Sequence, residues 1–142
     1  MESPKEVHIN PQQLAGIFEG EKQKMEQLTQ RFNAMQGVVN ETKGAIDALK
    51  ILSKAKKGLA VKIPLGGGAL IDVTIDKLEK VQLNLPGSLL LDYTPENAIK
   101  EMEKRLASIE KNISLLEKEI QQTYKNLDNI SKAVNRISAA NK

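Results

Sequence analysis

Residues 99–137 read IKEMEKRLASIEKNISLLEKEIQQTYKNLDNISKAVNRI, and apolar side chains recur in this stretch at alternating steps of three and four residues. The pattern runs from Ile99 and Met102 to Ile137, and only Thr123 interrupts it. Steps that average 3.5 residues keep one apolar stripe facing a partner helix over many turns, as a left-handed coiled coil requires. The stretch therefore predicts a long helix that pairs with another helix along an apolar seam.

A second run with the same spacing lies near the other end of the chain. It extends from Leu14 to Leu49, and only Glu21 and Thr42 break it. Glu21 can be interpreted in two ways: a seam carboxylate loosens the coil, or it selects the register of the pair. Two seams in one chain raise the possibility that the helices pair with each other.

The charges beside the two seams test that possibility. One antiparallel register forms three pairs of opposite charge: Lys50 with Glu103, Lys43 with Glu110, and Arg31 with Glu119. Each exposed pair is worth only about 0.2–1 kcal/mol, so these pairs select the register while the apolar seam holds the helices together. We therefore predict an intramolecular antiparallel hairpin of two long helices.

Between the helical runs, residues 59–93 change to a period of two. Apolar residues alternate with polar ones, and the chain turns at Gly66-Gly67-Gly68 and again at Pro86-Gly87. This pattern predicts four short strands in two consecutive β-hairpins. Isolated hairpins are marginally stable in water, so several chains joined through these segments would bury the apolar faces and close the sheet edges.

The expected fold is α+β: a long antiparallel coiled-coil helical hairpin with two central β-hairpins that assemble into a β-barrel platform between subunits. Residues 1–142 are expected to form one domain, with coil helices over about 11–56 and 95–138. Asn10 and Thr94 are the expected helix caps, each followed by proline. The expected assembly residues are the apolar residues of the strands: Ile63, Leu65, Ile71, Val73, Ile75, Val81, Leu83, Leu85, Leu89 and Leu91.

The amino-acid composition argues against several classes of function. The formal net charge is only +3, and lysines and glutamates are interleaved, which argues against binding to nucleic acid. There is no cysteine and His8 is the only histidine, so we expect no metal site and no cofactor. No nucleophile–base pair is visible, so we do not expect an enzyme. No apolar leader or stretch of about 18 apolar residues is present, so we expect a cytoplasmic protein without membrane contact.

The chain resembles the α class of the prefoldin family. The resemblance is carried by residues 61–68, VKIPLGGG, and by residues 93–98, YTPENA, which open the second long helix. In that family a similar strand and glycine turn lies between two heptad helices, and the α class has two hairpins per chain. One departure is the second turn, Leu85-Pro86-Gly87-Ser88, where the family usually has Gly-x-Gly; this leaves the turn type open.

The resemblance implies an ATP-independent chaperone, a holdase. It implies assembly with β-class prefoldin subunits as an α2β4 hexamer, capture of unfolded client proteins at the coil tips, and delivery to a group II chaperonin. Exposed apolar side chains at an uncovered end can meet a client, and several weak contacts give avidity. The expected client-binding residues are Leu14, Ile17, Phe18, Ile130, Val134 and Ile137.

Other interpretations stay open at this stage. Some archaeal relatives of prefoldin build filaments through the β platform, and the sequence is compatible with that. A coiled-coil scaffold that binds one defined partner helix, and an RNA-contacting helical hairpin, are the alternatives from other classes. The seam residues Val134 and Ile137 could serve only the helix pair, and Val7 and Ile9 could extend the tip or fray.

Overall fold

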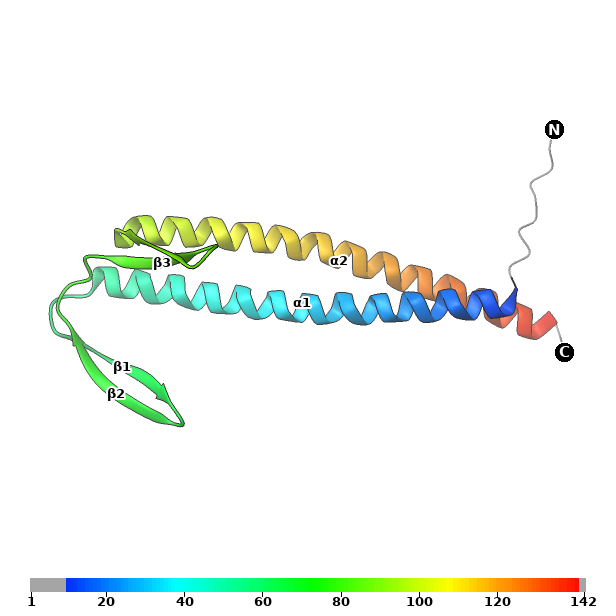
Figure 1. Cartoon of the computed structure of the whole chain (residues 1–142), viewed down its shortest axis with the longest axis horizontal. Helices are drawn as coiled ribbons and strands as arrows, with labels where there is room; N and C mark the ends of the chain where they lie inside the picture. Colours follow the sequence, from blue (N-terminus) through cyan, green and yellow to red (C-terminus); the bar gives the residue numbers. More distant parts are fainter. Residues whose placement is uncertain (1–9, 141–142) are drawn as a thin grey trace, which may run out of the picture. The chain divides into compact units, whose positions relative to one another are not determined.

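A computed structural model describes residues 10–140, in two long helices and four strands. The order is α1 (Pro11–Lys54), β1 (Leu59–Gly66), β2 (Ala69–Ile75), β3 (Val81–Leu85), β4 (Leu89–Tyr93) and α2 (Pro95–Ala140), as Figure 1 shows. The predicted α+β class and the helix–two hairpins–helix order are confirmed. The suggestions about Val7, His8 and Ile9 fall outside the described residues.

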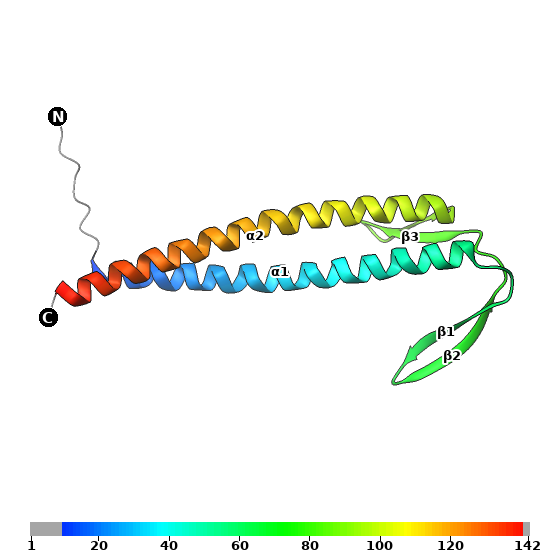
Figure 2. The same cartoon turned by 180° about the vertical axis from the view of Figure 1, so that it is seen from behind.

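Two compact units make up the chain. Among the described residues, unit 1 combines residues 10–36 with 111–140, and unit 2 is Gly37–Glu110. Each unit contains part of α1 and part of α2, and within each unit the two helices lie side by side (Figures 1 and 2). Unit 2 also contains both hairpins. A single domain over residues 1–142 stays a prediction.

Both predicted caps are present at the helix starts. The Asn10 side chain accepts a hydrogen bond from the Gln12 amide at 3.1 Å, and the Thr94 hydroxyl accepts one from the Asn97 amide at 3.2 Å. These bonds satisfy amides that have no partner inside the helix. α1 ends at Lys54, slightly before the predicted end at about residue 56. The Gly58 amide donates to the Ile75 carbonyl at 3.0 Å and so belongs to the first hairpin.

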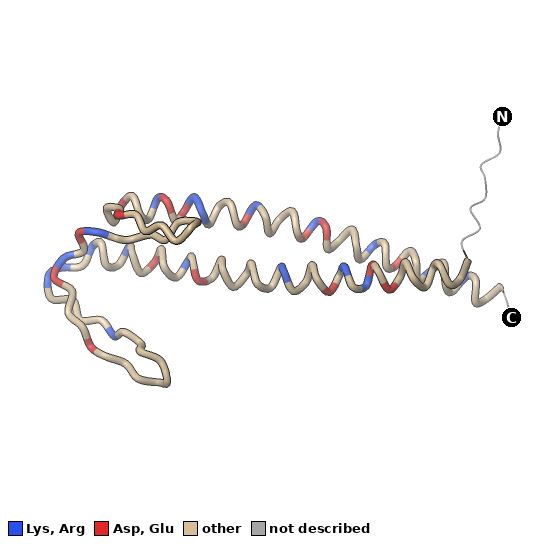
Figure 3. Tube along the Cα trace, in the orientation of Figure 1, with Lys and Arg blue, Asp and Glu red and all other residues tan. Residues whose placement is uncertain are grey.

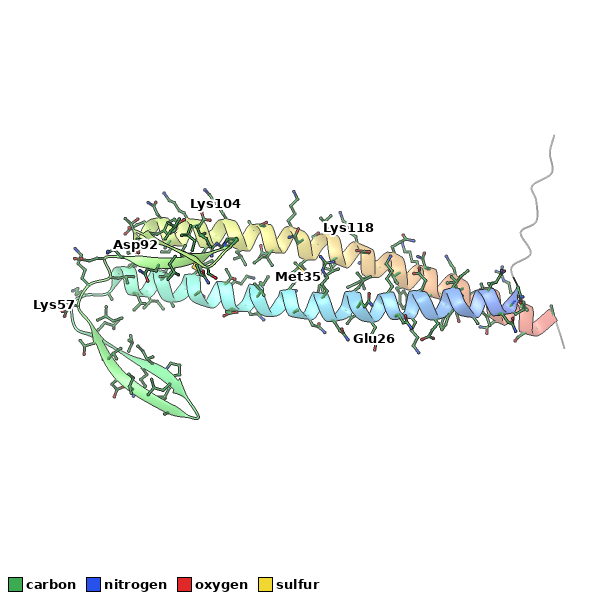
Figure 4. The ribbon with its side chains drawn as sticks, in the orientation of Figure 1. Glu26, Met35, Lys57, Asp92, Lys104 and Lys118 are labelled. Atoms are coloured by element: carbon green, nitrogen blue, oxygen red, sulfur yellow. The ribbon has the colours of Figure 1, made fainter. Side chains whose placement is uncertain are left out.

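In unit 1, the seam residues are buried between α1 and α2. Leu28, Ile113 and Leu116 are buried, and Thr123 is the most deeply buried side chain of this unit, with 1% of its surface exposed. The Thr123 hydroxyl donates to the Glu119 carbonyl at 2.9 Å, which satisfies it within its own helix. In Figure 4, Met35 lies between the two helices while Glu26 points away from α2. The heptad pattern therefore identified the facing side of each helix correctly.

In unit 2, two predicted ion pairs confirm the antiparallel register. The Nζ atoms of Lys50 and Lys43 lie 3.4 Å and 3.5 Å from the carboxylates of Glu103 and Glu110, respectively. The seam residues Val39 and Ile46 of this unit are buried, and so is Ala98, which precedes the first seam residue of α2.

The third predicted pair, Arg31 with Glu119, is replaced in unit 1. Glu119 lies 3.5 Å from the Nζ atom of Lys24 instead. Lys24 and Arg31 occupy equivalent positions one heptad apart on α1, and the carboxylate of Glu119 pairs with the lysine.

The two hairpins form separate two-stranded antiparallel sheets, β1 with β2 and β3 with β4. The first turn uses Gly67 and Gly68, whose φ angles of 58° and 81° suit a type I′ turn, because that turn needs positive φ at both central residues. The second turn, Pro86-Gly87-Ser88, joins the paired residues Leu85 and Leu89, with positive φ angles at Gly87 (84°) and Ser88 (60°). The chain thus closes this hairpin without the family's usual Gly-x-Gly.

Candidate functional site

The first candidate surface lies in unit 1, where α1 begins and α2 ends; we call it the end surface. Its predicted client-binding residues differ in exposure. Ile17 and Val134 expose 49% and 40% of their surface, whereas Leu14 exposes only 6%. Phe18, Ile130 and Ile137 are half-buried. The structure therefore brings all six to one end of the helix pair, but only two are largely open to solvent.

An apolar hollow opens between the helices on the end surface. It has a volume of about 290 Å³ and is shallow. Three residues of each helix line it: Pro11, Leu14 and Ala15 from α1, and Val134, Ile137 and Ser138 from α2. A hollow with mostly apolar walls can take up an apolar side chain of another protein, because such contact removes apolar surface from water.

A second hollow, of about 260 Å³, lies nearby in unit 1, and most of the residues that line it are polar. Ile17 and Ile130 line it together with Glu21, Asn126 and Asn129. The Asn126 side-chain amide donates to the Glu21 carboxylate at 3.3 Å across the two helices. The seam glutamate thus has a partner on the opposite helix, which favours the register interpretation over the loosening one.

The second candidate surface is the apolar face of the β1–β2 hairpin in unit 2. Residues paired across antiparallel strands share a face, so this face consists of three apolar pairs. They are Leu59 with Ile75, Val61 with Val73, and Ile63 with Ile71. The opposite face is mixed: it carries the Lys62–Asp72 ion pair at 2.8 Å, and it also pairs Pro64 with Leu70. Since Ile63 and Ile71 are exposed, the single chain leaves much of the apolar face uncovered.

The β3–β4 hairpin is different because the chain itself covers part of its apolar face. Leu83 pairs with Leu91, and Val81 and Leu85 pair with Tyr93 and Leu89. Leu83 exposes only 7% of its surface, which a free two-stranded ribbon could not achieve. In Figure 1, β3 runs beside the helices of unit 2. Leu89 and Leu91 remain exposed.

Sequence reasoning missed part of the exposed apolar surface of the hairpins. Leu70 and Leu90 lie on the hairpin faces opposite the predicted apolar ones, and each is 58% exposed. Leu65 falls at a register shift between Pro64 and Gly66, so it has no Cα partner in the ladder. A run of adjacent leucines at 89–91 was the one signal in the sequence that both faces of β4 would be apolar.

Over the described residues, charged side chains of both signs are dispersed rather than gathered into one patch. In Figure 3, lysines and arginines alternate with aspartates and glutamates along both helices. Over residues 10–140, no group of His, Asp and Glu side chains could hold a metal ion. In the same part of the chain, neither helix has an apolar stretch long enough to cross a bilayer. The exposed apolar surfaces described above are thus the main candidates for function.

Comparison with known proteins agrees with the fold. The family model described as "Prefoldin subunit" matches residues 22–140. This chain belongs to the prefoldin family. Members of the family are chaperones rather than enzymes. The match spans α2, both hairpins and most of α1.

Individual relatives support the assignment. The prefoldin subunit alpha of Methanococcoides burtonii is 29% identical over 84 residues, which are 59% of this chain and 61% of the relative. The chain thus matches less than two thirds of that relative's length. The relative is an α subunit, which agrees with the resemblance to the α class.

Two solved prefoldin structures share the fold. A filamentous prefoldin from Methanocaldococcus jannaschii has a TM-score of 0.70 at 18% identity, covering 83% of this chain and 98% of that chain. The prefoldin beta subunit from Thermococcus strain KS-1 has a TM-score of 0.61 at 16% identity, covering 89% and 90%. At these identities the likeness establishes the fold alone.

Proposed function

We propose that this chain is a subunit of an ATP-independent holdase that captures unfolded proteins on the end surface and passes them to a group II chaperonin. Family membership supports the chaperone role. The observation that carries the binding proposal is the exposure of Ile17 and Val134 beside hollows at the open end of the helix pair. Unfolded proteins expose apolar side chains, so such a surface can bind many of them without sequence specificity.

Assembly is proposed to use the apolar faces of the hairpins. The β1–β2 face is largely uncovered in the single chain, and both sheets have open edges because each contains only two strands. Partner subunits that add strands and apolar side chains would cover both features. We propose β-class prefoldin subunits as these partners, in an α2β4 hexamer whose hairpins form a barrel platform. A cytoplasmic location stays a prediction of the sequence.

The binding proposal can be tested by aggregation suppression without ATP. The chain, assembled with a β-class prefoldin subunit, should keep reduced, unfolded lysozyme in solution. Ile17→Ser together with Val134→Ser should weaken this suppression several-fold, because both side chains lie on the end surface. The matched control is Ile51→Ser with Leu115→Ser, since these side chains are 65% and 56% exposed but lie elsewhere on the helices. Equal loss in both variants would contradict binding at the end surface.

Self-assembly is a second candidate. One of the structurally similar proteins is a filamentous prefoldin, and the uncovered β1–β2 face could equally pair with another copy of this chain. Size-exclusion chromatography with light scattering of the chain alone distinguishes self-assembly into filaments from the hexameric holdase. A broad mass distribution that grows with concentration favours filaments, whereas a small oligomer that converts to a hexamer on adding the β-class subunit favours the holdase proposal.

A further inference from the structure

Although charges of both signs alternate along α2, its lysines in unit 1 share one face of the helix. All four are exposed and follow one another at steps of seven residues: Lys111, Lys118, Lys125 and Lys132. Lys118 follows the buried seam residue Leu116 by two positions, a turn of about 200° in a helix, and it points away from α1 in Figure 4. Because seven residues make almost two full turns, the other three point nearly the same way. We call these four residues the lysine row.

Most of the lysine row has no negative partner within the described chain. Over residues 10–140, Lys132 pairs with Asp128 at 2.9 Å, and the other three lysines of the row form no ion pair. No acidic residue lies three or four positions from Lys118, where an acid on the same helix would be within reach. The nearby acid Glu119 lies on the side of α1, where it pairs with Lys24 at 3.5 Å. The outward face of α2 in unit 1 is therefore positively charged.

A row of separated cations suits a flexible chain of carboxylates. An extended polypeptide advances about 3.3–3.6 Å per residue, so three residues span the roughly 10 Å between neighbouring lysines of the row. Acidic side chains a few residues apart can thus reach successive lysines in one binding event. The flexible stem and compact charge of lysine allow it to pair with carboxylates in many geometries, as a partner without fixed structure requires.

Nucleic acid matches the lysine row less well. A strand of duplex DNA carries one phosphate about every 3.4 Å along the helix axis, so lysines roughly 10 Å apart would neutralise only about one phosphate in three. The residues four positions before and after Lys118 are Ser114 and Gln122, and neither is an aromatic side chain on which a base could stack. The spacing and the neighbouring residues therefore favour an acidic polypeptide.

We propose that the lysine row is a second client-binding surface, which holds acidic stretches of an unfolded protein along α2. The row belongs to the same unit as the end surface, so one client chain can contact both, and two linked contacts bind more tightly than either alone. This inference rests on the proposed function and adds a preference to it. Among equally apolar unfolded proteins, the acidic ones bind more tightly.

Binding of two labelled unfolded proteins, measured by fluorescence anisotropy without ATP, tests this preference. The probes are α-lactalbumin, which is acidic, and lysozyme, which is basic, both reduced and alkylated so that they stay unfolded. In the protein assembled with a β-class subunit, Lys111→Gln with Lys118→Gln and Lys125→Gln should weaken binding of α-lactalbumin several-fold and should not weaken binding of lysozyme. Glutamine has a helix propensity close to that of lysine, so the helix stays folded. The difference between this variant and the unaltered protein should disappear in 1 M salt, where charges are screened over about 3 Å.

Lys56→Gln with Lys57→Gln and Lys77→Gln is the matched control, because it removes the same charge from exposed positions in unit 2. It should leave binding of both probes unchanged. Unchanged binding of α-lactalbumin to the row variant would overturn the proposal, as would an equal loss for both probes or an equal loss in the control. Binding of a single-stranded oligonucleotide that the row variant loses, while it keeps α-lactalbumin, would also overturn the proposal and assign the row to nucleic acid.

The same measurements separate the lysine row from the holdase function. If lysozyme binds and the row variant retains α-lactalbumin, the lysine row is not a client surface while the holdase function stands. If the unaltered assembly binds neither unfolded protein, the holdase function fails, and the proposal for the row fails with it.

Discussion

Asn126 of α2 donates a hydrogen bond from Nδ2 to Oε2 of Glu21 on α1, at 3.3 Å across the seam of unit 1. Both residues are half-buried, and Glu21 stands at a position where a coiled coil normally has an apolar side chain. A carboxylate is tolerated there because the side-chain amide and the remaining solvent contact satisfy it. A polar pair inside a seam is also specific, since any shift of register would leave the charge without its partner.

Asn126→Ala should lower the free energy of unfolding by about 1 kcal/mol, because Glu21 would lose its hydrogen-bond partner in a partly buried site. In a Glu21→Leu background, the same asparagine substitution should cost almost nothing. Urea denaturation of the four proteins in this double-mutant cycle measures the coupling. A coupling close to zero would show that the hydrogen bond does not contribute to the helix pair.

Thr123→Val should raise the free energy of unfolding, by up to about 1 kcal/mol, because a methyl group replaces a buried hydroxyl in the seam. The hydroxyl now bonds to the Glu119 carbonyl, which lies at the i−4 position and so is also the acceptor for the Thr123 amide in a regular helix. Thr123→Ser is the matched control: it keeps the hydroxyl, removes the methyl and should be destabilising. Thermal denaturation followed by circular dichroism measures both, and a destabilised valine variant would refute the argument.

Lys43→Glu should destabilise the helix pair in unit 2 by about 0.2–1 kcal/mol, since it places a carboxylate opposite Glu110. Adding Glu110→Lys should restore most of the loss by reversing the pair. The difference between single and double variants should shrink in 1 M salt, where charges are screened over about 3 Å. Chemical denaturation at low and high salt checks this, and failure of the double variant to recover would argue against direct pairing.

Val73→Lys should prevent assembly while leaving the helices folded, because Val73 lies on the uncovered apolar face of the β1–β2 hairpin. Thr74→Lys adds the same charge to the opposite face, which already carries the Lys62–Asp72 ion pair, and should assemble normally. Light scattering in the presence of the β-class subunit measures the outcome. If both variants assemble, the β1–β2 apolar face is not the contact between subunits.

Leu83→Ala should act on the chain itself and not only on its assembly. The side chain is buried within the single chain, and a truncated buried leucine typically costs about 2–5 kcal/mol. Leu89→Ala, at an exposed position on the same hairpin face, is the control and should cost much less. Hydrogen exchange of the β3 and β4 amides measures the local effect. Similar protection in both variants would mean that Leu83 gains little from its burial.

Local patterns in the sequence accounted for most of the fold. The heptad steps identified the buried side of each helix, Asn10 and Thr94 identified the helix starts, and the glycines at 66–68 identified the first turn. These features follow from short-range geometry: a residue's position in a helical or extended repeat decides which way its side chain points. Two of the three predicted ion pairs also formed, because a shared register follows once the seam is known.

The candidate site was less predictable. Leu14 and Val134 both lie at heptad positions of the seams, yet Leu14 is buried and Val134 is exposed. Their difference depends on what each side chain meets on the opposite helix, which the pattern of one helix does not give. The pairing of Glu119 with Lys24 is similar, since the heptad pattern offers two equivalent cations one heptad apart and does not choose between them.

The sequence by itself determined the two seams, their antiparallel pairing, the two hairpins and one apolar face on each hairpin. These are set by periodicity and by the φ angles that glycine and proline allow. Only the tertiary structure decided which apolar residues the chain covers for itself, such as Leu83, and which it leaves open, such as Ile17, Val134 and Ile63. The physical reason is that burial depends on neighbouring elements distant in the sequence, whereas periodicity describes only one element at a time.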